Sequence, residues 1–289
     1  MIAELKGLGL GLAFLLSSAA AAAPKPEPVR AVWVGGPTLL FRFGPISILT
    51  DPVLGEGPAA FRMFDPNSGM EDALHARLAP LPRLEVETAD LVLLSHDHAD
   101  HLDDAALGRL KSRVSFVVPL AQEAVLRKRG VEAVLGLPWR ASHTIRKQGY
   151  SVTITAIPAQ HSERPDLLPA LGQVNGYWIE FRHRGYRKTV YWTGDSFPVP
   201  AEVTREFRAP DLLVPHLGGV GEGGPLGQVS MGAREAISFA RAVQPKAVLP
   251  IHHSTFSLYR EPVDRFAKAA AGQKWSLKLI DEGEELVLN

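Results

Sequence analysis

Short apolar runs, broken by glycine and proline, follow one another from residue 29 onward. Three runs of strand length lie around Gly-Gly-Pro and Phe-Gly-Pro breaks, at residues 30–34, 38–42 and 46–50. This pattern predicts an antiparallel meander. Residues 53–87 are rich in proline and glycine and lack a sustained period, although they contain Phe61, Met63 and Phe64. A long loop inside a compact domain is often functional, so we expect a flap here.

Strand and helix patterns alternate beyond residue 88. Helices are predicted at residues 104–111, 121–129, 198–207, 233–243 and 262–271. Strands are predicted at 89–94, 115–118, 152–157, 176–182, 189–192, 212–215 and 246–250, with a closing hairpin at 275–280 and 285–288. Residues 139–144 are interpreted as a link, and 218–227, with six glycines, as a flexible segment. Both halves mix strands with helices, which favours an α/β fold with layers in the order αββα.

The first 23 residues have a different pattern. Lys6 precedes an apolar stretch at 7–16, and small residues dominate the positions after it. This order is typical of a secretory signal peptide. We expect cleavage of residues 1–23 and export to the periplasm, leaving 24–28 as an extended proline-rich linker and 29–289 as the domain. The alternative is an uncleaved membrane anchor, because the apolar stretch is nearly long enough to span a bilayer.

Composition limits the chemistry. The chain has 289 residues, 46% of them hydrophobic, which is enough for a full core. Lys and Arg number 31 and Asp and Glu also 31, so the balanced charge gives no support for a nucleic-acid partner. There is no cysteine, which excludes disulfides, thiolate ligands and a thiol nucleophile. Any metal must therefore be held by histidine and carboxylate, which suits zinc, manganese or iron.

The densest cluster of candidate metal ligands directly follows the apolar run at 89–94. Four side chains that can bind a metal lie within six positions: His96, His98, Asp100 and His101. His96 and His98 are two residues apart, so in an extended segment they point to the same side and can share one metal. Asp100 and His101 lie past the bend and can turn toward a second metal. Asp103 is placed to cap the helix that follows.

Three later strands each end in a further candidate ligand. Pro158-Ala159-Gln160-His161 follows one strand, Thr193-Gly194-Asp195 the next, and the segment 250–256, which contains His252 and His253, a third. With the His-x-His-x-Asp-His string, these motifs resemble the metallo-β-lactamase superfamily over residues 29–289. They are most similar to the branch of N-acyl-phosphatidylethanolamine-hydrolysing phospholipase D and L-ascorbate-6-phosphate lactonase. Gly35-Gly36-Pro37 departs from that branch, as does Ser196 after Asp195.

The resemblance implies the αββα sandwich and a dinuclear centre. It places three side chains on the first metal: His96, His98 and His161. It places three on the second: Asp100, His101 and His252. Asp195 bridges both. The cofactors expected are two divalent ions, zinc foremost and manganese or iron as alternatives. A water between two such ions ionises near neutral pH and supplies a hydroxide nucleophile, and Asp100 could take the proton released during attack.

For several other polar residues, the sequence leaves more than one role possible. Neighbouring residues of a strand face opposite ways, so His252 and not His253 should reach the metal, although His253 could line the pocket. His216 follows a predicted core strand and is either a substrate-side acid or donor, or a structural histidine. Asp51 either orients a ligand histidine or starts a turn. Three histidines are given no site role: His75 at the surface, His143 as structural or exposed, and His183 at a hairpin tip.

These observations favour an exported dinuclear hydrolase that acts on a phosphodiester, ester or lactone. The apolar flap favours a small-molecule or lipid-like substrate. No stable membrane span is expected after cleavage, and the sequence makes no prediction of oligomeric state. A β-lactamase is less favoured, because the cysteine ligand common in one such group is missing. The alternatives are an iron oxidoreductase on the same scaffold and a non-catalytic metal-binding protein.

Overall fold

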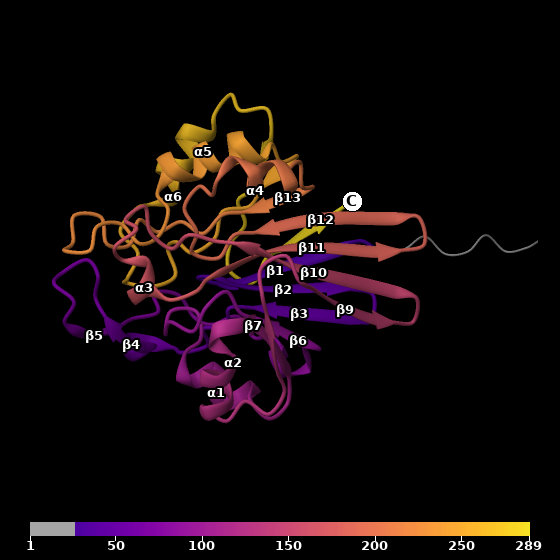
Figure 1. The fold of residues 1–289 in the computed structure, drawn as a ribbon, viewed down its shortest axis with the longest axis horizontal. Coiled ribbons are helices and arrows are strands. Elements are labelled where there is room, and N and C mark those ends of the chain that lie inside the picture. Colours follow the sequence, from indigo (N-terminus) through magenta and orange to yellow (C-terminus); the bar gives the residue numbers. More distant parts are fainter. Residues whose placement is uncertain (1–26) are drawn as a thin grey trace, which may run out of the picture.

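Two seven-stranded mixed sheets pack face to face and carry helices on their outer faces (Figure 1). The computed structural model describes residues 27–289, so the predicted signal peptide and most of the linker lie outside the described residues. Within residues 27–289, none of the helices has the length and apolar character needed to cross a membrane. The observed layers confirm the prediction of an αββα sandwich.

The first sheet has the order β16-β1-β2-β3-β6-β7-β8. Its strands are β1 (Val29–Gly35), β2 (Thr38–Phe43), β3 (Ile46–Thr50), β6 (Leu91–Leu93), β7 (Ser115–Pro119), β8 (Val134–Leu137) and β16 (Glu285–Leu288). Strands β1, β2 and β3 pair antiparallel, which confirms the meander. Strands β3, β6, β7 and β8 pair in parallel, so their carboxyl ends meet at one edge of the sheet.

The second sheet has the order β15-β14-β13-β12-β11-β10-β9. Its strands are β9 (Ser142–Lys147), β10 (Tyr150–Pro158), β11 (Asn175–His183), β12 (Tyr186–Trp192), β13 (Leu212–Val214), β14 (Ala247–Val248) and β15 (Ser276–Leu277). Strands β9 to β12 are antiparallel, and β12 to β15 are parallel. Strands β10, β12, β13 and β14 therefore run in the same direction and end at the same edge.

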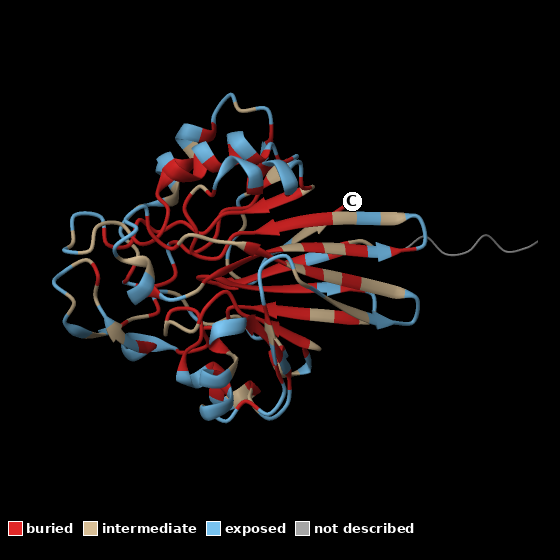
Figure 2. Cartoon of the chain, viewed as in Figure 1, coloured by how far each residue is buried: buried red, intermediate tan, exposed pale blue. Residues whose placement is uncertain are grey.

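Alternation along the strands explains how each sheet packs on both faces. In β2, Leu39 and Phe41 belong to the core between the sheets, whereas Leu40 packs toward the outer layer. In β13, Leu212 faces the inner core and Leu213 the outer one. A period of two with apolar residues on both sides is the pattern of a strand buried on both faces. Figure 2 accordingly shows buried strands between helices whose outer surfaces are exposed.

The outer layers contain short helices. They are α1 (Asp104–Leu110), α2 (Glu123–Lys128), α3 (Leu168–Leu171), α4 (Ala201–Glu206), α5 (Ala233–Val243) and α6 (Val263–Ala270). Helices α1 and α2 lie against the first sheet, and α4, α5 and α6 against the second (Figure 1). Helix α5 has the predicted bounds and buries Ile237, Ala240 and Val243 on one face, as expected for an amphipathic helix.

Several local predictions are wrong. The final strands do not form a hairpin, because β15 joins β14 in the second sheet and β16 joins β1 in the first. Residues 139–144 are not only a link, since 142–147 form β9. Residues 53–87 contain a two-stranded sheet of β4 (Phe61–Phe64) and β5 (Asp72–His75). The partners of β15 and β16 are distant in sequence, so local pattern does not reveal those pairings, whereas β9 and β4–β5 pair with their neighbours in the chain but have only a weak strand pattern.

Two histidines expected at the surface or in a turn are buried instead. His75 is only 4% exposed, stacks on Phe61 with ring centroids 5.1 Å apart, and has Nε2 3.3 Å from the Met63 carbonyl oxygen. His183 ends β11 and stacks on Tyr150 at 3.6 Å. Each ring thus packs on an aromatic ring of a neighbouring strand. Among the described residues, neither belongs to a group that could hold a metal.

Asp103 fixes the start of α1 and is a suitable test of the fold beside the site. Its carboxylate accepts from the backbone N–H of Ala106 at 2.7 Å and of Gly55 at 2.6 Å. Asp103→Ala leaves two buried donors unpaired, so we expect the free energy of unfolding to fall by about 2–4 kcal/mol. Urea denaturation measures this change. Asp104→Ala, at a fully exposed side chain, should change it by about 0.5 kcal/mol at most. Equal losses would contradict the capping role.

Candidate metal centre

The His-rich segment follows β6 and is held in a tight turn. Ser95 donates from its backbone N–H and its hydroxyl to Asp51, at 2.7 and 2.6 Å, which fixes the beginning of the loop. The backbone N–H groups of His101 and Leu102 both donate to the carbonyl of His98, at 2.9 and 2.8 Å. This turn points His96 and His98 to one side and brings Asp100 and His101 round to the other, as the spacing predicts.

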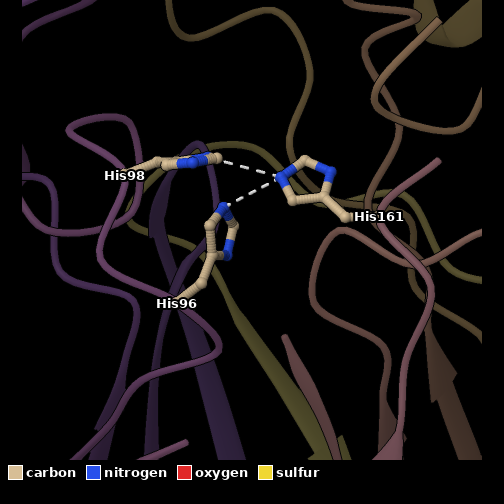
Figure 3. Close-up of side chains that lie close together, drawn as sticks. All are labelled: His96, His98 and His161. Atoms are coloured by element: carbon tan, nitrogen blue, oxygen red, sulfur yellow. Dashed lines mark hydrogen bonds between the residues drawn. The ribbon is translucent and has the colours of Figure 1, made fainter. Parts of the chain in front are cut away.

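The first group consists of three imidazoles from two loops. Nε2 of His161 lies 3.1 Å from Nε2 of His96 and 3.3 Å from Nδ1 of His98 (Figure 3). Nδ1 of His161 donates to the Val229 carbonyl at 2.9 Å, which leaves its Nε2 with a lone pair directed at the other two rings. Three ring nitrogens that converge in this way are the donor set that a divalent cation takes from histidine.

Burial keeps these rings neutral. It lowers the pKa of His98 to about 4 and that of His96 well below its ordinary value, and neighbouring imidazoles add to both shifts. The pKa of His161 is also lowered by burial, although Asp195 opposes the shift. At neutral pH the three nitrogens therefore carry lone pairs rather than protons, which is the state required for metal binding.

The second group combines Asp100, His101, Asp195 and His252, whose ligand atoms lie within 4.8 Å of one another. Nε2 of His101 is 3.4 Å from Oδ1 of Asp195, and Nε2 of His252 is 3.6 Å from Oδ2 of Asp100. Nε2 of each of these histidines and Oδ1 of Asp195 are buried and have no hydrogen-bond partner. Buried polar atoms without partners are costly. A cation that binds all of them would remove this cost, so these residues fit a metal ion.

The remaining ring nitrogens fix the orientation of the second group. Nδ1 of His101 donates to Asp51 at 2.6 Å, and Nδ1 of His252 donates to the Leu217 carbonyl at 2.9 Å. Such contacts set the tautomer that leaves Nε2 free for a metal. His252 also adopts a left-handed backbone with φ of 62°, a conformation that costs on the order of 1 kcal/mol in a residue other than glycine.

In the second group, the pKa of each residue depends on the charges of its neighbours. Burial alone would raise the pKa of Asp100, but His101 and His252 outweigh it and lower the value to about 2. The pKa of Asp195 is likewise lowered, because His252 and His101 overcome its burial. Burial opposes a charge on His101, yet Asp195, Asp51 and Asp100 raise its pKa well above the ordinary value. The carboxylates thus remain ionised and require positive charge beside them.

Gly194 allows Asp195 to approach the His-rich loop. A Cβ at this position would lie 2.7 Å from Cβ of Ser95 and 3.0 Å from the Asn175 carbonyl oxygen, and φ is 59°. Only glycine meets both conditions without strain. The close approach brings Asp195, after β12, against side chains that follow β6 in the other sheet.

A narrow pocket of about 20 Å³, partly open to solvent, leads to the two groups. The groups supply four of its wall residues: His98, Asp100, His161 and Asp195. The β4–β5 hairpin supplies Met63, Phe64 and Pro66, so the predicted flap does lie beside the site. His96, His101 and His252 lie deeper, with no exposed surface. The pocket therefore reaches the groups from the side where Asp100 and Asp195 are accessible.

The structure brings together all seven residues predicted as ligands, while their binding of metal stays a prediction. Asp51 makes the contact expected of a residue that orients a ligand histidine. His253 lies outside the groups, with its ring 4.8 Å from that of Trp33. His143 lies in β9, also outside them.

His216 lies near the second group but does not line the pocket. It has no exposed surface, and together with Asp51 and His101 it forms a third group that could hold a metal. Its role on the substrate stays a prediction. The sequence did not indicate the orienting contacts from Ser95 and from the carbonyls of Leu217 and Val229. A backbone carbonyl leaves no signature in a sequence.

Asp51 offers a test of how the second group is oriented. Asp51→Ala removes the acceptor of His101 Nδ1–H, so the ring can rotate, and we expect metal affinity to fall about 10–100-fold. Competition with a chelator measures the affinity. Asp90→Ala serves as control, because Asp90 accepts from Ser47 N–H at 3.0 Å at a distance from both groups. Unchanged affinity in the Asp51 variant would contradict its orienting role.

Known proteins resemble this chain in sequence. A model of the beta-lactamase superfamily domain matches residues 47–253. N-acyl-phosphatidylethanolamine-hydrolyzing phospholipase D 1 of Caenorhabditis elegans is 27% identical over 274 residues, which cover 88% of this chain and 74% of that protein. A metal-dependent hydrolase of Archaeoglobus fulgidus is 26% identical over 269 residues, 90% of this chain and 100% of that one. The lactonase resemblance stays a prediction.

Solved structures share the fold. A possible metal-dependent hydrolase from Veillonella parvula superposes with a TM-score of 0.73 at 18% identity, covering 91% of this chain and 100% of that one. An isothiocyanate hydrolase from Delia radicum gut bacteria gives 0.73 at 20% identity, covering 89% and 98%. A diiron β-hydroxylase from Streptomyces venezuelae gives 0.61 at 17% identity, covering 92% and 55%. The family model spans more than half of the sequence, so this chain belongs to the beta-lactamase superfamily, with the fold and buried histidine–aspartate groups of a metal-dependent hydrolase.

Proposed function

We propose that this protein is an exported dinuclear hydrolase that acts on a phosphodiester, ester or lactone of a small-molecule or lipid-like substrate. One observation carries the proposal: two adjacent groups of buried histidine and aspartate atoms, several without hydrogen-bond partners, lie at the base of a pocket. His96, His98 and His161 would hold the first ion. Asp100, His101 and His252 would hold the second, with Asp195 between the two.

The two ions would lower the pKa of a water molecule between them and polarise the bond to be broken. The residues of the chain supply position and proton transfer. Asp100 lines the pocket, where its carboxylate would be placed to accept the proton of the attacking water. Asp195 also lines the pocket and offsets part of the charge of the ions.

Histidine and carboxylate donors support zinc first, with manganese and iron as alternatives. Iron would allow an oxidoreductase, and the likeness to the diiron β-hydroxylase extends to the fold alone. A purely structural metal site is less favoured, because such sites are closed and Asp100 and Asp195 reach a pocket.

Metal content and hydrolysis, measured together, test the proposal. We expect about two metal ions per chain and hydrolysis of bis(p-nitrophenyl) phosphate or a simple lactone. Asp195→Ala and His161→Ala each remove a proposed ligand, so activity should fall at least about 100-fold. His143→Ala, outside both groups, should retain it. Two ions without hydrolysis of any substrate would favour redox chemistry or a binding role. Absence of metal under every loading condition would overturn the proposal.

Export rests on the pattern of residues 1–23 and is tested separately. We expect the full-length chain, expressed in a Gram-negative host, to accumulate in the periplasm with a new amino terminus near residue 24. Mass spectrometry of the intact protein measures the cut. A chain that retains residues 1–23 and sediments with membranes would identify the uncleaved anchor instead.

A further inference from the structure

The loop that carries His252 has a strained backbone. His252 and Ser254 both adopt left-handed conformations, with φ of 62° and 60°. In residues other than glycine, such conformations persist only where the surrounding structure holds them in place. Since the imidazole of His252 belongs to the second metal-binding group, the contacts that hold this backbone also decide where the ligand nitrogen lies.

Hydrogen bonds join this loop to the turn between β1 and β2. The backbone N–H of His252 donates to the Gly36 carbonyl at 2.9 Å, and Gly36 N–H donates to the Thr255 hydroxyl oxygen at 2.6 Å. Gly36 therefore contacts the loop at both ends of its strained part. The bond to Thr255 uses a lone pair of the hydroxyl oxygen, so the hydroxyl proton must point away from Gly36.

Glu282 accepts that proton. It lies between β15 and β16, and its Oε1 accepts from the Thr255 hydroxyl at 2.7 Å. The His253 carbonyl, at 3.3 Å, is a more distant acceptor for the same hydroxyl, and a carboxylate forms the stronger bond. The carboxylate of Glu282 thus fixes the orientation of Thr255. From Thr255, the hydrogen bonds continue through Gly36 to His252.

Arg77 compensates the charge of Glu282. Nη2 of Arg77 lies 2.5 Å from Oε2 of Glu282, and the Arg77 side chain has no exposed surface while that of Glu282 is 13% exposed. The same nitrogen donates to the Val34 carbonyl at 2.6 Å, and Nε donates to the Ala79 carbonyl at 3.0 Å. A largely buried carboxylate needs a partner of opposite charge. Arg77 therefore allows Glu282 to lie where it contacts Thr255.

Gly35 and Gly36 leave room for this network. A Cβ at Gly35 would lie 2.4 Å from Nη2 of Arg77 and 2.8 Å from Oε2 of Glu282. A Cβ at Gly36 would lie 2.7 Å from the ring of Phe256. Both glycines also have positive φ, 122° and 53°, which other residues rarely adopt. Side chains at these positions would displace the ion pair or the Phe256 ring.

We propose that Glu282 is a positioning residue for the second metal ion. Its hydrogen bond to Thr255 holds the backbone of His252 in the conformation that directs Nε2 toward the other residues of the second group. This inference rests on the proposed function, because it needs a metal ion at that group. Glu282 belongs to none of the groups within residues 27–289 that could hold a metal, and it does not line the pocket. It therefore acts on the metal only through the loop.

A matched pair of variants at Thr255 tests the inference without a change of charge. Thr255→Val removes the hydroxyl and keeps the shape of the side chain, whereas Thr255→Ser keeps the hydroxyl. Zinc titration in competition with a chelator measures the two binding steps, and His161→Ala and His101→Ala assign them to the first and second groups. In Thr255→Val, we expect the ion of the second group to bind about 10–100-fold less tightly and that of the first to change less than about twofold. Thr255→Ser should retain both affinities.

Glu282→Ala tests the origin of the effect. The variant lacks the acceptor of the Thr255 hydroxyl, so the ion of the second group should again bind about 10–100-fold less tightly. Glu284→Ala is the control, because Glu284 is exposed in the same segment and its carboxylate accepts from Asp281 N–H at 2.9 Å. It should leave both affinities unchanged. If Glu282→Ala does not fold, because it leaves Arg77 buried without its partner, the pair at Thr255 decides the question.

Selective loss of one ion distinguishes positioning from a merely structural role. A structural role would lower the free energy of unfolding of the metal-free protein and weaken both sites alike, and that result in Thr255→Val would overturn the inference. Binding of both ions by Thr255→Val with the affinities of the wild type would also overturn it and leave the proposed function intact. A wild-type protein that binds no metal ion would overturn the proposed function, and the inference with it.

Discussion

The concentration of imidazole and carboxylate groups in a buried volume is the constraint on which the rest of the structure depends. Asp51, Asp100 and Asp195 are buried close to His101, and burial of carboxylates costs several kcal/mol unless positive charge lies beside them. A proton on His101 can provide such charge within the chain. A cation bound at Nε2 would replace that proton, and it would also occupy nitrogen and oxygen atoms that otherwise have no hydrogen-bond partner. Metal binding and folding are therefore expected to support each other.

Two sheets are needed because no single loop can supply both groups. Strand β6 in the first sheet and strands β10, β12 and β14 in the second all end at the same side of the sandwich, and a ligand follows each of them. The hydrogen-bonded sheets set the spacing between the loops. Hydrogen bonds to Asp51 and to the carbonyls of Leu217 and Val229 set the orientation of the histidine rings. The positions of the ligand side chains thus come from the sheet topology, and their orientations come from hydrogen bonds.

The sequence predicted the parts of the fold that local pattern determines. The meander, helix α5, the Asp103 cap and the spacing of His96 and His98 follow from periods of 2 and 3.6 and from capping chemistry. It did not predict that β15 and β16 join different sheets, because their partners, β14 and β1, are distant in sequence. His75 was misplaced for a different reason: the segment rich in proline and glycine gave no strand pattern, and the stacking of His75 on Phe61 depends on the β4–β5 pairing.

The metal-binding groups and the walls of the pocket carry different information about function. Groups of this composition support hydrolysis of several kinds of bond, so the ligands alone do not select a substrate. Selection must come from residues that contact the rest of the substrate. Most of the other residues that line the pocket lie on the β4–β5 hairpin, or on the glycine-rich segment at 218–227 and the residues after it, and Asn67 joins these two parts. That lining is apolar and packs on the core, so the part of the molecule with the weakest sequence pattern is the part that shapes the pocket beside the metal-binding groups.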